Sequence, residues 1–176
     1  MIVVARRYAR ALVEAMAPDS TDAGLEQLRR FARLLEDEPY TRTVLMNPVI
    51  PTESRDEFFA TISKVLGFDR RVQKLLLLLV DRRRLEILDD LIEAYQNLLD
   101  ERNGIVRADV VAASVLSESE RRELAEKLGK TTGKRIEMEV GQDPSLIGGL
   151  VVRIGSTVYD GSVRQSLLRF KERLNS

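Results

Sequence analysis

The residue types that most often perform acid–base catalysis and bind metals are missing from this chain. It has no histidine and no cysteine, which excludes disulfides and thiolate chemistry and removes the commonest general acid–base and metal ligand. Asp143 and Asp160 could form a carboxylate pair, but each stands in a predicted turn, where aspartate is favoured for local hydrogen bonds. Gly148 and Gly149 lack the Gly-Lys-Ser/Thr ending of a phosphate-binding loop. We therefore expect no catalytic residue, no cofactor and no metal site.

Charge limits the classes of partner that the chain can bind. Its 28 basic and 28 acidic residues cancel, whereas a protein that binds nucleic acid or anionic lipid usually has an excess of Lys and Arg. The arginine clusters at residues 70–71, 82–84 and 121–122 stand among many acidic residues, and we interpret them as solvated surface. We expect protein partners and no nucleic acid. A helical RNA-binding or antitermination-like adaptor is the alternative interpretation.

Nothing in the sequence predicts a membrane span or a targeting segment. The longest apolar run, residues 75–80, has six residues, whereas a helix needs roughly 20 to cross a bilayer. Near the N-terminus the arginines follow the apolar residues, which is not the order of a secretory signal. The sequence therefore predicts a chain that is made and kept in the cytosol.

Glycine and proline divide the chain into two regions. Only two of the ten glycines, Gly24 and Gly67, precede residue 104, and four of the five prolines lie in that first region. This distribution predicts an α+β protein, with an N-terminal six-helix bundle at residues 1–104 and a small mixed α/β domain at residues 105–176. The six helices are expected at 2–17, at 22–36, from Pro39 to Asn47, from Thr52 to Gly67, after a cap at Asp69, and after a cap at Asp81 to about residue 103.

The second region has the periodicity of short strands. Residues 105–113 are apolar and β-branched, and apolar residues alternate with polar ones between 136 and 140. Between them, a capping box at Ser117–Glu120 predicts a helix. Two more strands are expected at 150–154 and 157–159. Ser162 would cap a last helix, whose apolar residues fall at helical spacing: Val163, Leu167, Phe170 and Leu174.

The fifth helix is unusual because it is apolar all round between Lys74 and Asp81. Such a helix must be covered on every side. One interpretation is a central helix covered by its own bundle. The other is that one face binds an external amphipathic helix, and the first helix favours it somewhat through a second apolar stripe that includes Ala11 and Ala15. The first and fifth helices could then form the walls of a groove.

Three segments resemble the delta subunit of F-type ATP synthases, the relative of the mitochondrial oligomycin-sensitivity-conferring protein. The opening helix at residues 5–12, ARRYARAL, is similar to that of the family, and so are the Leu-rich segment and the RRLEIL that follows it at 83–88. The most specific match is DPSLIGG at 143–149, followed by DGS at 160–162. Together these segments extend over nearly the whole chain.

The resemblance implies a non-enzymatic subunit of the peripheral stalk, or stator, of a proton-translocating ATP synthase. Its helical domain would bind N-terminal segments of the alpha subunits, and its second domain would hold the C-terminal helices of the b subunits against rotor torque. One copy would lie at the cytoplasmic face of the bacterial plasma membrane, attached to it only through the complex. The expected groove for the alpha subunit is Tyr8, Ala11, Ala15, Val72, Leu76 and Leu79. The expected stalk-binding residues are Val163, Leu167, Phe170 and Leu174.

Overall fold

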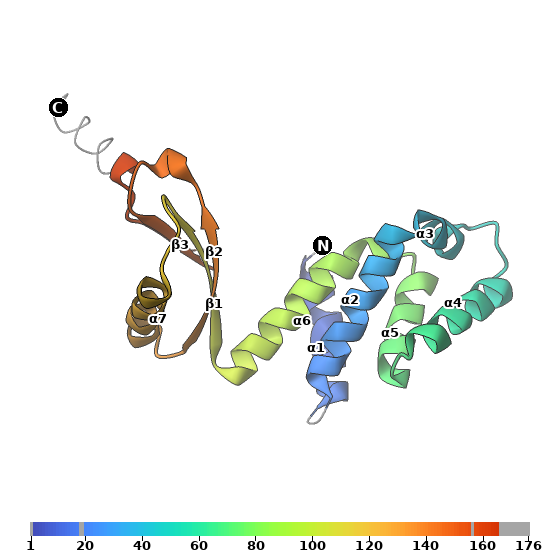
Figure 1. Ribbon diagram of the computed structural model, residues 1–176. Helices are drawn as coiled ribbons and strands as arrows, with labels where there is room; N and C mark the ends of the chain where they lie inside the picture. Colours follow the sequence, from blue (N-terminus) through green and yellow to red (C-terminus); the bar gives the residue numbers. More distant parts are fainter. Residues whose placement is uncertain (1, 18–19, 156, 166–176) are drawn as a thin grey trace. The chain divides into compact units, whose positions relative to one another are not determined.

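The computed structural model describes residues 2–17, 20–155 and 157–165. The chain divides into two compact units, Met1–Leu99 and Asp100–Ser176. The first unit is helical and the second carries a mixed sheet (Figure 1). The α+β class predicted from the sequence is confirmed.

The helices of the first unit form around one hydrophobic core. In α2, Leu25, Leu28, Phe31 and Leu35 recur at spacings of three and four residues, and all of them are buried. The ring of Phe31 meets two other phenylalanines edge-on, Phe59 at a centroid distance of 5.9 Å and Phe68 at 6.0 Å. The described helices are α1 (Ile2–Met16), α2 (Thr21–Asp37), α3 (Pro39–Met46), α4 (Thr52–Leu66), α5 (Arg70–Asp81) and α6 (Leu88–Asn103), with a short 3₁₀ helix at Leu85–Ile87.

The start of the sixth helix differs from the prediction. Asp81 does not cap α6 but is the last residue of α5. The chain then turns through Arg83, which has a φ of 53°, and α6 begins only at Leu88. The turn follows the Schellman pattern, because Arg84 N–H donates to the carbonyl of Leu79 and Arg83 N–H donates to that of Val80. Arginine in this position gives no turn signal in the sequence.

The second unit contains a four-stranded mixed sheet in its described part, in the order β2-β1-β3-β4. β1 runs parallel to β2, with Val110 opposite Val140, and antiparallel to β3, with Val110 opposite Val152. β3 pairs antiparallel with the edge strand β4. The elements are β1 (Ile105–Ala112), α7 (Glu118–Thr132), β2 (Arg135–Gln142), a 3₁₀ turn (Pro144–Leu146), β3 (Leu150–Ile154) and β4 (Thr157–Asp160).

Helix α7 makes the crossover between the parallel strands β1 and β2. The predicted capping box is present, since Ser117 accepts from the backbone N–H of Glu120 and the Glu120 carboxylate accepts from that of Ser117. Leu124 and Leu128 of α7 pack against the apolar face of the sheet. Ser162 also caps as predicted, because its Oγ accepts from Gln165 N–H at 3.1 Å. The rest of that predicted helix, from residue 166 on, lies outside the described residues.

Candidate partner-binding surface

Two polar contacts join α1 to the α5 region, one near the C-terminal end of α1 and one near its middle. Near the C-terminal end of α1, Arg71 Nη1 of α5 donates to the carbonyl of Ala15 at 2.9 Å. In its N-terminal half, Tyr8 accepts a hydrogen bond from Arg84 Nη1, just beyond α5, at 3.2 Å. The start of one helix therefore lies beside the end of the other, so the two run antiparallel.

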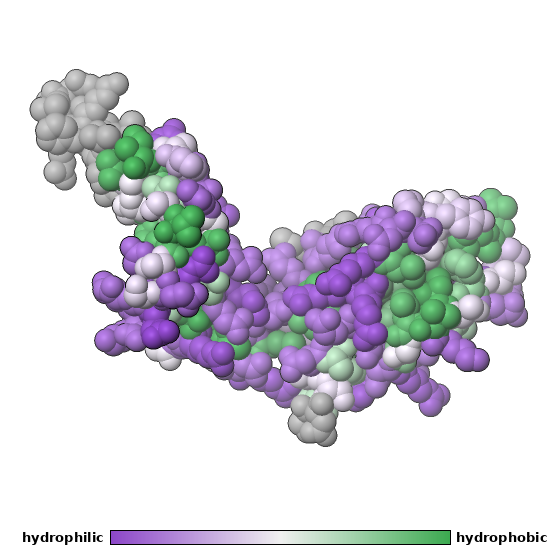
Figure 2. Space-filling model, in the orientation of Figure 1, coloured by the Kyte–Doolittle hydropathy of each residue, from purple (hydrophilic) through white to green (hydrophobic). Residues whose placement is uncertain are grey.

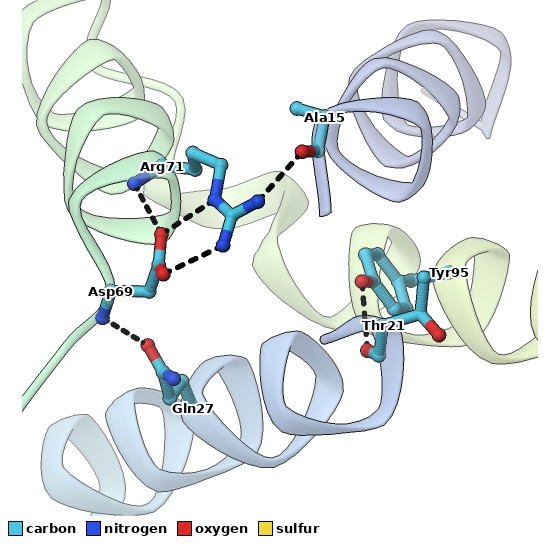
Figure 3. A network of polar contacts seen from close by, with 6 residues as sticks. All are labelled: Ala15, Thr21, Gln27, Asp69, Arg71 and Tyr95. Atoms are coloured by element: carbon cyan, nitrogen blue, oxygen red, sulfur yellow. Dashed lines mark hydrogen bonds and ion pairs between the residues drawn. The ribbon is translucent and has the colours of Figure 1, made fainter. Parts of the chain in front are cut away.

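The first of these contacts belongs to a larger polar network (Figure 3). The Asp69 carboxylate caps α5 by accepting from Arg71 N–H at 2.8 Å, and it accepts two further bonds from the Arg71 side chain. Gln27 of α2, itself buried, accepts from the backbone N–H of Asp69 at 2.6 Å. The side-chain bonds from Arg71, and after them the bond from its backbone N–H, lower the pKa of Asp69 from 3.8 to about 2. The network fixes the start of α5 against α1 and α2.

The predicted groove residues separate into two groups. From α1, Ala11 and Ala15 are exposed and Tyr8 is half-buried. From α5, Val72, Leu76 and Leu79 are completely buried in the core of the unit. These three side chains face the core and are not at the surface. The sequence could not choose between the faces of α5, since both are apolar.

Among the leucines of α5, Leu78 is exposed, with 37% of its surface accessible. It shares one side of the helix with Arg71, seven residues earlier, because seven residues complete nearly two turns. Because Arg71 reaches α1, we infer that Leu78 lies on the side of α5 that borders α1. We call Tyr8, Ala11, Ala15 and Leu78 the α1/α5 strip. The sequence analysis missed Leu78 because, in a run of five leucines, no polar residue indicates which leucine faces the solvent.

A second apolar area lies on the other side of α5, next to α4. Figure 2 shows hydrophobic residues gathered over these two helices. Phe58 and Ile62 of α4 and Leu77 of α5 are half-buried and pack against the core. They therefore already have partners within the chain, as surface-edge residues of the core usually do.

In the second unit, one of the four predicted stalk-binding residues can be placed. Val163 is 42% exposed. Leu167, Phe170 and Leu174 lie outside the described residues. Other apolar side chains of this unit are exposed as well, among them Val158 and Tyr159 of the edge strand β4.

The two aspartates considered for chemistry form local turn bonds. The Asp143 carboxylate accepts from Ser145 N–H at 2.9 Å, and the Asp160 carboxylate accepts from Ser162 N–H at 2.9 Å. The bonds from Ser145 lower the pKa of Asp143. Within the described residues, no group of three or more acidic side chains has the arrangement of a metal site. In the same part of the chain, no helix is both long and apolar enough to cross a membrane.

The chain is similar to known proteins over nearly its full length. The family model described as ATP synthase delta (OSCP) subunit matches residues 4–174. The delta subunit of ATP synthase from Desulfosudis oleivorans is 38% identical over 173 residues, which cover 98% of this chain and 94% of the relative. The one from Syntrophobacter fumaroxidans is 38% identical over 174 residues, covering 98% and 95%.

A solved structure has the same fold. A chain in the mitochondrial ATP synthase hexamer of Toxoplasma gondii superposes with a TM-score of 0.67 at 18% identity, covering 98% of this chain and 97% of that one. The assignment to a family rests on the family model and the two delta subunits, whereas the T. gondii chain supports the fold alone. The chain belongs to the ATP synthase delta (OSCP) subunit family, and it is a non-catalytic peripheral-stalk subunit of an F-type ATP synthase.

Proposed function

We propose that this subunit links the N-terminal segments of the alpha subunits to the C-terminal helices of the b subunits and so resists rotor torque. The helical unit binds the catalytic head, and the α/β unit binds the stalk. One copy serves each complex, at the cytoplasmic face of the bacterial plasma membrane. The bacterial delta subunits to which the chain is similar support this placement.

The observation that carries the proposal is the α1/α5 strip. Ala11 and Ala15 are small and exposed, so the backbone of another helix can approach α1 closely. Leu78 offers an apolar side chain beside them. An amphipathic helix that lies along the strip would bury its apolar face, which is a common mode of peptide recognition.

Rigidity behind the strip suits a part that bears mechanical load. Val72, Leu76 and Leu79 fix α5 to the core from the opposite face, and Arg71 fixes its first turn to α1. A packed core resists deformation. A partner helix held on this strip therefore transmits force to the whole helical unit and not to one loose helix.

The test is binding of a synthetic peptide that copies the N-terminal segment of the alpha subunit from the same organism, measured by calorimetry. We expect wild type to bind and Leu78→Asp to lose about ten-fold or more in affinity, as for a central apolar contact. Val65→Asp is the matched control, because Val65 is 79% exposed on α4, outside the strip. Leu76→Asp is not a suitable test of binding, because a charge at this buried position would disrupt the core. Equal binding by wild type and Leu78→Asp would refute the proposed surface.

For the stalk, the candidate that can be placed is Val163. This exposed residue stands directly after the Ser162 cap, at the start of the segment that holds the other three candidates. We expect Val163→Asp to weaken the capture, by the full chain, of a C-terminal fragment of the b protein and to leave binding of the alpha peptide unchanged. Unchanged capture of the b fragment by Val163→Asp would contradict a role of Val163 in the stalk site.

A further inference from the structure

We propose that the segment bound along the α1/α5 strip carries acidic side chains at one end, and that Arg7, Arg83 and Arg84 receive them. This inference rests on the proposed function, because it specifies the chemistry of the partner at the same surface. The three residues are called the arginine cluster below. Arg7 and Arg84 contact Tyr8, which is the end of the strip farthest from Ala15, and Arg83 directly precedes Arg84 in the chain.

Two guanidinium groups from different elements meet at the Tyr8 side chain. Arg84 Nη1 donates to the phenol oxygen at 3.2 Å, and the Arg7 guanidinium carbon lies 5.8 Å from the ring centroid. Contact with an aromatic ring and a hydrogen bond each restrict the motion of an arginine side chain. The cluster is therefore partly preorganised, which lowers the entropy lost when an anion binds.

The charge of the cluster is not neutralised within the described part of the chain. There, no carboxylate lies within ion-pair distance of Arg7, Arg83 or Arg84. The acid next to them in sequence, Asp81, is held instead by Arg55, whose Nη2 donates to Asp81 Oδ1 at 2.9 Å. Glu86 is exposed and forms no ion pair with the cluster in the same part of the chain. The positive charge thus remains available to a partner.

Arg83 itself is held in a conformation that does not favour arginine. Its φ of 53° is in the left-handed region, where a side chain is strained and glycine is the usual residue. Helix α4 ends in the same hydrogen-bond pattern and has Gly67 at this position, with a φ of 64°. The exposed Arg83 side chain therefore does not serve the turn. A role in binding would account for an arginine at this position.

An acidic peptide fits this surface better than nucleic acid or lipid does. The planar guanidinium groups match carboxylates in paired hydrogen bonds, and the cluster continues into the apolar strip at Tyr8 and Ala11. The chain as a whole has zero net charge, which does not favour a polyanion.

The experiment uses the full chain and two peptides. One is the native peptide from the N-terminus of the alpha subunit, and the other is a copy with every Asp and Glu replaced by Asn or Gln. The variants are the double Arg7→Gln/Arg83→Gly, the single Arg84→Gln, and the control Arg42→Gln, an exposed arginine of α3 outside the cluster. Binding is measured at low and at high salt. Thermal melts check that each variant folds.

We expect the double variant to bind the native peptide about ten-fold more weakly at low salt, since each exposed charge contact contributes up to a few-fold. The neutralised peptide should bind wild type and the double variant alike, and Arg42→Gln should behave as wild type. The inference is wrong if the double variant keeps full affinity for the native peptide, or if that peptide has no acidic end.

The outcomes also separate this inference from the proposed function. Suppose that the native peptide binds wild type, that Leu78→Asp abolishes this binding, and that the arginine variants do not weaken it. The α1/α5 strip would then be supported as the binding surface, and the acidic contact with the arginine cluster would be refuted. If the native peptide does not bind wild type, both the proposed function of the strip and the acidic contact are refuted. Anionic phosphatidylglycerol vesicles and a single-stranded oligonucleotide serve as alternative probes. The double variant could lose affinity for the vesicles or the oligonucleotide and keep its affinity for the native peptide. That result would show that the arginine cluster binds the lipid or the nucleic acid, and the inference would be wrong.

Discussion

Arg71 holds the carboxylate of Asp69 with two parallel hydrogen bonds, from Nε to Oδ1 at 2.8 Å and from Nη2 to Oδ2 at 2.9 Å. The pair sits at the start of α5, and Arg71 also reaches the last turn of α1. The bond that caps α5 and the bond that joins the two helices therefore depend on one pair of side chains.

This pair predicts a stability change in acid. Asp69 has a folded pKa of about 2, below its ordinary 3.8, so its contribution is complete above about pH 5 and is lost as the pH falls through 2. The pair is partly exposed, so we expect it to contribute about 1 kcal/mol. Asp69→Asn keeps a capping side chain but loses the charge. Urea unfolding should show a gap between wild type and variant that closes from pH 5 to pH 2. A gap of constant size would contradict this assignment.

Neighbouring leucines of α5 should differ in their effect on stability. Leu76 is completely buried and Leu78 is 37% exposed. We expect Leu76→Ala to cost about 3 kcal/mol, since it leaves a cavity in the core, and Leu78→Ala to cost about 1 kcal/mol or less. Chemical denaturation measures both values. Similar costs at the two positions would mean that Leu78 is part of the core and would remove it from the α1/α5 strip.

Gly24 in α2 should resist replacement by alanine, although alanine normally stabilises a helix. A Cβ atom there would lie 2.6 Å from the hydroxyl of Tyr95, which is buried and donates to the Thr21 carbonyl. We expect Gly24→Ala to destabilise by about 2 kcal/mol through overpacking. In a Tyr95→Phe background the added cost should shrink. Gly129→Ala in α7 is the control, because its Cβ would meet only Lys134 O at 3.4 Å, and it should not destabilise.

Helices and strands could be predicted from the sequence wherever the apolar periodicity agreed with the residues that mark helix ends. In α2 the apolar residues follow the helical repeat, and in the second unit the Ser117–Glu120 capping box marks the start of α7. The start of α6 was predicted wrongly because Asp81 resembles a helix cap. The strained turn at Arg83 lacks the glycine that usually reveals such a turn.

The candidate surface could be predicted only in part, for a reason that is visible in α5. Its residues 75–80 are all apolar, so no polar position marks which side faces water. The orientation is set by contacts far apart in the sequence, such as Arg71 with Ala15 and Arg84 with Tyr8. In α1, by contrast, the exposed charged residues Arg7, Arg10 and Glu14 mark one polar side of the helix, and the predicted Ala11 and Ala15 are exposed.

Gly149 should be essential to the fold of the second unit. It has a φ of 79°, and a Cβ atom there would lie 2.3 Å from the carbonyl oxygen of Gly161. Because that neighbour is backbone, it cannot move aside cheaply, and we expect Gly149→Ala to destabilise by about 3 kcal/mol or more. Gly155→Ala should cost only about 1 kcal/mol, since its φ is also positive but nothing lies within 4 Å. Hydrogen exchange should show faster exchange in β1 and β3 for the first variant only.

The two helices that end in the same turn give a paired test of backbone strain. Helix α4 ends with Gly67 at a φ of 64° and α5 with Arg83 at 53°. We expect Arg83→Gly to stabilise the protein by about 1 kcal/mol and Gly67→Ala to destabilise it by a similar amount. Thermal melts measure both. A loss of stability in Arg83→Gly would mean that the arginine side chain supports the fold, and the argument that it is kept for binding would fail. If Arg83→Gly is more stable and also binds the acidic peptide more weakly, then the arginine side chain contributes to binding while its backbone conformation costs stability.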